Sequence, residues 1–228
     1  MNPLKLTIIL IAAGCGLACD RSPPETASPP PVTTSRPAAS PATAIKLPRV
    51  VFLGDSLTAG LGVDPDEAFP MLIAKQLKDA GVAAQVVNAG VSGDTTAGGL
   101  RRLDWVLRQA PDVLVVGLGG NDGLRGLSPE ASADNLRAII QRARQSGARV
   151  LLLGMMIPPN YGPEYTKAFR EIYPKLAAEQ NVPLVPFVLE GVGGDPRFNQ
   201  RDGIHPTAEG HQIIAANVGQ YVARLVKP

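Results

Sequence analysis

From Leu47 onward, the chain alternates between short apolar runs and longer stretches in which apolar residues recur every three or four positions. Short runs of this kind predict β-strands, and the longer periodic stretches predict amphipathic helices. Five strands are expected, at Arg49 to Leu53, Gln85 to Asn88, Val113 to Leu118, Arg149 to Met155 and Pro183 to Pro186. Five helices are expected after them in turn, at Glu67 to Ala80, Ala97 to Gln109, Pro129 to Ser146, Pro163 to Gln180 and Thr207 to Leu225.

The regular alternation of strands and helices is typical of parallel βαβ units and predicts an α/β fold, a three-layer α/β/α sandwich. The third and fourth strands contain the unbroken apolar runs Val113 to Val116 and Val150 to Leu153, so both are expected to be central in the sheet. Gly81 and Gly147 stand where helices are expected to end. In such folds ligands bind beyond the carboxyl ends of the strands, so functional residues are expected in the loops there.

The first 46 residues differ in composition from the rest and are predicted to precede the folded domain. Lys5 comes before the apolar run Leu6 to Ala13, which is too short to span a bilayer and is typical of a signal peptide, so we expect export to the periplasm or cell envelope. Small residues then precede Cys15 and Cys19, which resembles a bacterial lipobox, where a cysteine carries a lipid anchor in the membrane. An ordinary cleaved signal peptide is the alternative.

The segment after the second cysteine is rich in Pro, Ser, Thr and Ala. Such a composition cannot bury a core and predicts an extended linker. The chain is therefore divided into a signal segment at 1–19, a linker at 20–46 and one domain at 47–228.

Composition narrows the chemistry that this domain can perform. The 228 residues carry a formal net charge of +2 with mixed signs, so a nucleic-acid partner is not expected. Both cysteines precede the domain, which excludes a thiol nucleophile and a thiolate metal site there. Only His205 and His211 can supply imidazole chemistry, and no cluster of ligand types indicates a metal, so neither metal nor cofactor is expected.

Three glycine-rich loops after predicted strands each carry one candidate for a polar role. Ser56 lies in a Gly-Asp-Ser-Leu turn whose backbone N–H groups could meet an oxyanion, although capping of the next helix is the alternative. Gly93 lets the backbone approach a ligand closely and offer an amide. Asn121 supplies an uncharged carboxamide donor suited to a developing oxyanion, unless it only forms a turn.

A fourth loop, near the C-terminus, pairs a carboxylate with an imidazole. Asp202 precedes His205 by three residues, and within one tight turn it can hydrogen-bond a ring nitrogen and set the tautomer. Pro206 is expected to start the last helix and hold this turn. His211 lies inside that helix, so we assign it a structural role.

Four blocks resemble those of the SGNH, or GDSL, hydrolases and occur in the family's order. They are Gly-Asp-Ser-Leu at 54–57, Ser-Gly-Asp-Thr at 92–95, Gly-Gly-Asn-Asp at 119–122 and Asp-Gly-Ile-His-Pro at 202–206. Segments 119–126, 159–162 and 172–176 are similar to the bacterial periplasmic thioesterase I group, which includes arylesterases and lysophospholipases. The resemblance implies the SGNH hydrolase fold, with a flavodoxin-like five-stranded parallel sheet.

The resemblance also implies a serine esterase that hydrolyses small-molecule acyl esters or thioesters through an acyl-enzyme. In that reading Ser56 is the nucleophile, His205 the base and Asp202 the residue that orients it. The oxyanion hole consists of the backbone amides of Ser56 and Gly93 with the Asn121 side chain. The lipobox and linker depart from the simple cleaved signal of the soluble group.

An apolar cleft for the acyl group is expected from the loops after the third and fourth strands. Leu124, Pro159 and Tyr161 are the candidate substrate contacts. Trp105, in the middle of a predicted helix, is expected in the core rather than against a ligand.

Two other functions fit the same blocks. A carbohydrate O-deacetylase shares the fold, and an envelope tether would suit removal of acetyl groups from glycans. The short apolar loop after Asn121 favours acyl chains instead. A non-catalytic envelope module that binds lipid or a partner protein is the second alternative, and the presence of every expected side chain argues against it.

Overall fold

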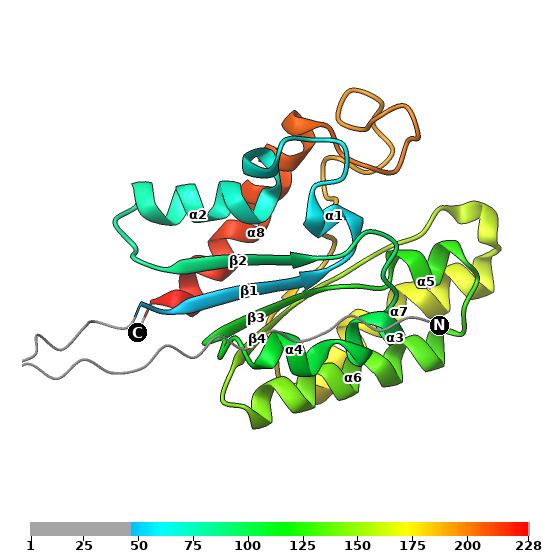
Figure 1. The fold of residues 1–228 in the computed structure, drawn as a ribbon. Coiled ribbons are helices and arrows are strands. Elements are labelled where there is room, and N and C mark those ends of the chain that lie inside the picture. Colours follow the sequence, from blue (N-terminus) through cyan, green and yellow to red (C-terminus); the bar gives the residue numbers. More distant parts are fainter. Residues whose placement is uncertain (1–46, 228) are drawn as a thin grey trace, which may run out of the picture. The chain divides into compact units, whose positions relative to one another are not determined.

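The computed structural model describes residues 47–227, which form a parallel five-stranded sheet with helices on both faces (Figure 1). The strands are β1 (Arg49–Gly54), β2 (Gln85–Gly90), β3 (Val113–Gly117), β4 (Arg149–Leu153) and β5 (Leu184–Val185). They lie in the order β2-β1-β3-β4-β5, which is the flavodoxin-like order. The predicted fold class is therefore confirmed, with β3 at the centre of the sheet and β4 beside it.

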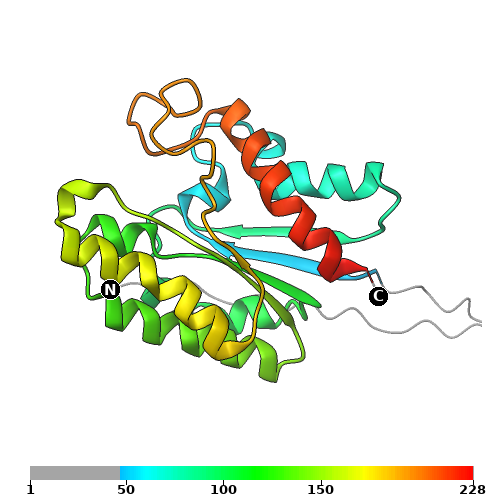
Figure 2. The ribbon, with the colours of Figure 1, turned by 180° about the vertical axis from the view of Figure 1, so that it is seen from behind.

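The helices form two layers. Figure 1 and Figure 2 show α2 (Phe69–Asp79) and α8 (Ala208–Val226) together on one face of the sheet. The other face carries α3 (Thr96–Arg101), α4 (Leu103–Leu107), α6 (Pro129–Gln145) and α7 (Pro163–Gln180). Four short elements lie in the loops that follow the strands: α1 (Ser56–Ala59), η1 (Pro65–Glu67), α5 (Gly120–Leu124) and η2 (Pro159–Tyr161).

The hydrophobic core lies on both sides of β3, all of whose residues are buried. Leu136 and Ile139 of α6 and Ile214 and Val218 of α8 are fully buried as well. Burying an aliphatic side chain of this size contributes roughly 1.5–3 kcal/mol. Both helical layers therefore hold the sheet rigidly, and with it the strand ends from which the loops emerge.

Three glycines in register end the first three strands, since Gly54 pairs with both Gly90 and Gly117. A Cβ on Gly54 would lie 1.9 Å from Oγ1 of Thr58, and one on Gly90 would lie 2.3 Å from the backbone nitrogen of Ala59. Helix α1 can pack onto the strand ends only because these positions lack side chains. The glycines thus place the first turn of α1, which begins with Ser56.

One predicted helix is two helices in the structure. The stretch expected at Ala97 to Gln109 breaks at Arg102 into α3 and α4. The break changes the phase of the second part, so that Leu103 and Val106 are buried while Trp105 is 52% exposed. The prediction that Trp105 lies in the core is therefore wrong.

Smaller differences occur at element ends. The fourth strand, expected to reach Met155, ends at Leu153. The last helix begins at Ala208, after a Thr207 cap. Pro206 does not start this helix and instead forms an isolated β-bridge with Asn199.

The predicted signal segment, the predicted linker and both candidate lipidation sites, Cys15 and Cys19, lie outside the described residues. Between residues 47 and 227, no helix has the length and apolar character needed to cross a membrane.

Candidate active site

Ser56 is the first residue of α1, directly beyond the carboxyl end of β1. Asp55 caps this helix, because its Oδ1 accepts a hydrogen bond from the backbone N–H of Leu57 at 3.0 Å. The helix ends after one turn at Gly60, whose φ of 79° is in the left-handed region that favours glycine. Asp55, and not Ser56, is thus the residue that caps the helix. The Ser56 side chain makes its hydrogen bond to another partner.

That partner is His205, which is 149 residues away in the sequence and has its Nε2 2.9 Å from Oγ of Ser56. On the other side of the ring, Nδ1 lies 2.6 Å from Oδ2 of Asp202. An ionised carboxylate can only accept hydrogen bonds, so the neutral imidazole carries its proton on Nδ1. Nε2 is then free to accept the hydroxyl proton of Ser56.

Asp202 is held ionised by its own loop. Its Oδ1 accepts the backbone N–H groups of Ile204 and His205, both at 3.0 Å. These bonds, the Ile204 amide first, together with the His205 side chain, lower the pKa of Asp202 from 3.8 to about 2. The carboxylate is therefore charged throughout the neutral range and can stabilise a protonated imidazole.

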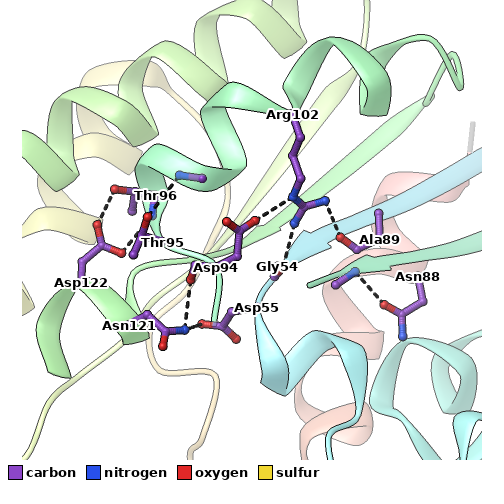
Figure 3. Close-up of polar contacts among 12 residues, drawn as sticks. Gly54, Asp55, Asn88, Ala89, Asp94, Thr95, Thr96, Arg102, Asn121 and Asp122 are labelled. Atoms are coloured by element: carbon purple, nitrogen blue, oxygen red, sulfur yellow. Dashed lines mark hydrogen bonds and ion pairs between the residues drawn. The ribbon is translucent and has the colours of Figure 1, made fainter. Parts of the chain in front are cut away.

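Asn121 lies in α5, beyond β3, and lines the same cleft as Ser56. Its Nδ2 donates to the backbone carbonyl of Asp94 at 3.0 Å and, more weakly, to Oδ2 of Asp55 at 3.5 Å (Figure 3). Gly93, which precedes Asp94, has a φ of 80°. The structure thus brings Asn121 to the loop that contains Gly93, although Gly93 itself is not among the residues that line the cleft.

A cleft of about 380 Å³ opens beside Ser56. This volume is within the range of small-molecule sites, ~300–1,000 Å³. Its polar lining includes Asp55, Ser56, Asn121 and His205. Its apolar lining comes from the loops after β3, β4 and β5 and includes Leu124, Met155, Met156, Ile157, Pro158, Pro159, Phe187 and Leu189.

The three predicted substrate contacts have different positions in this cleft. Leu124 and Pro159 line it, whereas Tyr161 does not. The hydroxyl of Tyr161 instead donates to the backbone carbonyl of Leu124 at 2.8 Å. Tyr161 therefore supports the loop that carries Leu124 rather than contacting the cleft.

Asp55 has a feature that the sequence analysis missed. The residue is 2% exposed although it lines the cleft. Burial raises the pKa of Asp55 from 3.8 to about 6, against the opposing effect of the Leu57 N–H bond. The only sequence signal for this residue is its place in the Gly-Asp-Ser-Leu block, which does not show burial.

His211, the other histidine, is fully buried inside α8. Its Nδ1 accepts the backbone N–H of Phe69 at 3.3 Å, and the two rings are stacked. Burial, and secondarily the charge of His205, lowers the pKa of His211 from 6.5 to about 4. These contacts support the structural role assigned to it.

A serine, a histidine and an aspartate hydrogen-bonded in series beside an apolar cleft, at the carboxyl edge of a parallel sheet, define a serine hydrolase site. Across the described part of the chain, no three His, Cys, Asp or Glu side chains are grouped so as to hold a metal ion.

Comparisons with known proteins identify the family. The signature of the GDSL-like Lipase/Acylhydrolase family matches residues 52–213. Esterase TesA from Pseudomonas aeruginosa is 48% identical over 170 residues, which cover 74% of this chain and 85% of that protein. Thioesterase 1/protease 1/lysophospholipase L1 from Escherichia coli is 42% identical over 180 residues, covering 78% and 83%. A crystal structure of TesA has a TM-score of 0.75 at 46% identity and covers 78% of this chain and 99% of its own. The chain belongs to the GDSL-like lipase/acylhydrolase family.

Proposed function

We propose that this protein is a serine hydrolase that cleaves carboxylic esters and thioesters through an acyl-enzyme on Ser56. Arylesterase, acyl-CoA thioesterase and lysophospholipase-type reactions all fall in this class. The observation that carries the proposal is the continuous chain of hydrogen bonds from Ser56 Oγ through His205 to Asp202, at 2.9 and 2.6 Å. The names of the relatives, an esterase and a thioesterase/lysophospholipase, support the same chemistry.

In the first half of the reaction, Oγ of Ser56 attacks the acyl carbonyl while Nε2 of His205 takes the hydroxyl proton. Asp202 stabilises the imidazolium through Nδ1 without taking a proton itself. The imidazolium then gives its proton to the leaving alcohol or thiol, and the C–O or C–S bond breaks. Water repeats the sequence on the acyl-enzyme, so that a carboxylic acid leaves and Ser56 is regenerated.

Negative charge develops on the carbonyl oxygen in both halves. The backbone N–H of Ser56 is available for it, because the first amides of a helix have no partner within the helix. The amide of Gly93 and Nδ2 of Asn121 complete the proposed oxyanion hole. The Asn121 hydrogen that would serve the oxyanion is the one whose bond to Oδ2 of Asp55 is long, at 3.5 Å. Each well-placed donor of this kind is worth about 3 kcal/mol in the transition state.

The cleft favours an acyl chain as the group that Ser56 receives. Its side chains are mainly aliphatic or aromatic, including Leu124, Ile157 and Phe187, and such walls bind hydrocarbon better than a polar sugar. This argues for acyl esters over the carbohydrate O-deacetylase alternative. The assembled Ser56–His205–Asp202 chain likewise argues against a non-catalytic lipid-binding module.

Export with a lipid anchor at Cys15 or Cys19 is a separate part of the proposal, and it is supported by the sequence alone. Metabolic labelling with a radioactive fatty acid tests it, using Cys15→Ser, Cys19→Ser and the double variant. We expect one single variant to lose the label. Equal labelling of the double variant and the wild type would exclude this anchor.

The proposed activity is tested with nitrophenyl esters from acetate to palmitate, the matching acyl-CoA thioesters and acetylated sugars. We expect medium and long acyl esters to be hydrolysed with a higher kcat/KM than the acetate, because longer chains cover more of the apolar wall. Cleavage of acetylated sugars alone would favour the deacetylase. No cleavage of any of these substrates by the folded chain would contradict the proposal.

A further inference from the structure

Arg102, at the break between α3 and α4, contacts three separate segments beside the site (Figure 3). Its Nε donates to Oδ2 of Asp94 at 2.7 Å. Its Nη1 donates to the backbone carbonyl of Ala89 at 2.7 Å, and its Nη2 donates to that of Gly54 at 2.9 Å. Gly54 ends β1 and Ala89 lies next to the end of β2, so one guanidinium joins two strand ends to the loop that follows β2.

The Asp94 carboxylate occupies a closely fitted position. Only 11% of the Asp94 side chain and 19% of the Arg102 side chain are exposed. A Cβ on Gly98, in α3, would lie 1.7 Å from Oδ1 of Asp94. The carboxylate therefore keeps its place only with Arg102 on one side and a glycine on the other.

The backbone of Asp94 faces the proposed oxyanion hole. Its carbonyl accepts the hydrogen bond from Asn121 Nδ2 at 3.0 Å, and Gly93 is its immediate neighbour in the chain. The position of Asp94 therefore affects both donors: Asn121 through a hydrogen bond, and the Gly93 amide through the chain. Arg102 also binds the carbonyl of Gly54, two residues before Ser56, so it sets the position of these donors relative to the nucleophile.

A second contact joins the Asn121 segment to α3. The carboxylate of Asp122 is buried and accepts hydrogen bonds from the backbone N–H and the hydroxyl of Thr96, at 2.9 and 2.5 Å (Figure 3). These bonds join helix α5 and the start of α3 into one hydrogen-bonded unit. Arg102 connects that unit to the ends of β1 and β2.

We propose that Arg102 and Asp94 are a positioning pair for the oxyanion hole. This inference rests on the proposed function. Neither side chain lines the cleft, so both act through Asn121, the Gly93 amide and Ser56. Donors that are already in place when charge develops need no reorganisation, and a displacement of about 1 Å can cost ~100-fold in rate.

Arginine suits this position better than lysine. The planar guanidinium directs several N–H groups along fixed directions, and here three of them reach three acceptors on different segments. An ammonium group keeps the charge but is compact and cannot hold the same three acceptors in line. Arg102→Lys therefore keeps the positive charge beside Asp94 but removes the alignment of the three hydrogen bonds.

The test uses the full chain with Arg102→Lys and Gly98→Ala, which disturb the pair from opposite sides. Arg137→Lys is the matched control, because Arg137 forms a comparable ion pair with Glu179 on the exposed surface of α6 and α7. For each protein, kcat and KM are measured on one nitrophenyl ester, with active sites counted by a fluorophosphonate. The inhibition constant of an alkylboronic acid is also measured, because its tetrahedral serine adduct places an oxygen in the oxyanion hole.

We expect Arg102→Lys and Gly98→Ala to lower kcat about tenfold or more, while KM changes less than about threefold. The boronic acid inhibition constant should rise in parallel with the loss of kcat/KM. The control should stay within about threefold of the wild type on all three measures. This pattern is not produced by a general loss of stability, which reduces the number of active sites instead.

Two results would overturn the inference. One is a kcat/KM within about threefold of the wild type in the folded variants, and the other is a lower kcat with unchanged boronic acid affinity. If Arg102→Lys fails to fold, Gly98→Ala decides, since the atoms nearest its Cβ belong to the side chains of Asp94 and Arg101 rather than to the backbone. A wild-type chain that neither cleaves the ester nor reacts with the fluorophosphonate would contradict the proposed function instead.

Discussion

The amide nitrogen of Asn121 donates to the backbone carbonyl of Asp94 at 3.0 Å, across the loops that follow β2 and β3. A carboxamide has two N–H hydrogens, so this bond orients the group, while the second hydrogen makes only a long bond, at 3.5 Å, to Oδ2 of Asp55. The relationship explains how a side chain on a short surface helix can be held still beside Ser56.

Removing this amide should slow the reaction without unfolding the protein. We predict that Asn121→Ala lowers kcat by about 10²- to 10³-fold, because one donor to the developing oxyanion is lost. Steady-state kinetics and circular dichroism check this. Asn217→Ala, which removes an exposed amide that binds the carbonyl of Glu190, is the control and should behave as the wild type. Normal turnover in Asn121→Ala would remove this residue from the oxyanion hole.

Replacing Asp202 should act through the tautomer of His205. In Asp202→Asn the amide N–H can donate to Nδ1 of His205, which moves the imidazole proton to Nε2. A protonated Nε2 cannot accept the hydroxyl proton of Ser56. We predict a fall in kcat of about 10³- to 10⁴-fold. Asp195→Asn changes a carboxylate of the same long loop that pairs with Arg197 instead, and it should keep nearly full activity. Equal effects of the two substitutions would contradict the assignment of Asp202.

The buried histidine should make the fold sensitive to mild acid. The pKa of His211 is 6.5 in the unfolded chain and about 4 in the folded one, so between these values the unfolded state binds more protons. The contribution of neutral His211 to the free energy of unfolding is fully present above pH 6.5 and decreases as the pH drops toward 4. Between pH 7 and pH 5 the loss should be about 2 kcal/mol.

Urea unfolding of the wild type and of His211→Asn at both pH values measures this contribution. The asparagine keeps an acceptor for the Phe69 N–H but does not titrate. The wild type should lose about 2 kcal/mol more than the variant between pH 7 and pH 5. Identical pH dependence in the two proteins would show that His211 is not the group responsible.

The hydroxyl of Tyr161 should influence long substrates more than short ones. It supports Leu124 through a 2.8 Å hydrogen bond to the backbone, and Leu124 lines the cleft. We predict that Tyr161→Phe raises KM for long acyl esters by about two- to fivefold, the cost of one net hydrogen bond, with little effect on the acetate. Tyr221→Phe on α8, on the opposite face of the sheet, is the control. An equal change for the acetate and the palmitate would place Tyr161 outside chain recognition.

The sequence predicts the sheet and the Asp202–His205 pair because their signals are local, whereas the pairing of Ser56 with His205, 149 residues away, was expected only from the resemblance to the SGNH hydrolases. Unbroken apolar runs mark the inner strands, and the Asp202 to His205 contact spans only three residues. The tight packing of α1 against Gly54 was not predicted, since it depends on which glycines become neighbours across the sheet.

Other features could not be predicted because they depend on contacts between residues that are distant in the sequence. Arg102 binds groups 8, 13 and 48 residues away, and nothing in its neighbourhood indicates these partners. The break at Arg102 also turns Trp105 outward, against the continuous periodicity of the stretch. The burial of Asp55 arises from loops that meet only in the folded protein.

The reactivity of Ser56 as an activated nucleophile can be measured directly. The folded full chain is treated with a fluorophosphonate, and the adduct is measured by intact mass and located by peptide mapping. We predict one adduct at Ser56, its loss in Ser56→Ala, and normal labelling in Ser92→Ala, which removes an exposed serine from a neighbouring loop. The absence of an adduct on the folded wild type, or equal labelling of Ser56→Ala, would contradict the assignment of Ser56 as the nucleophile.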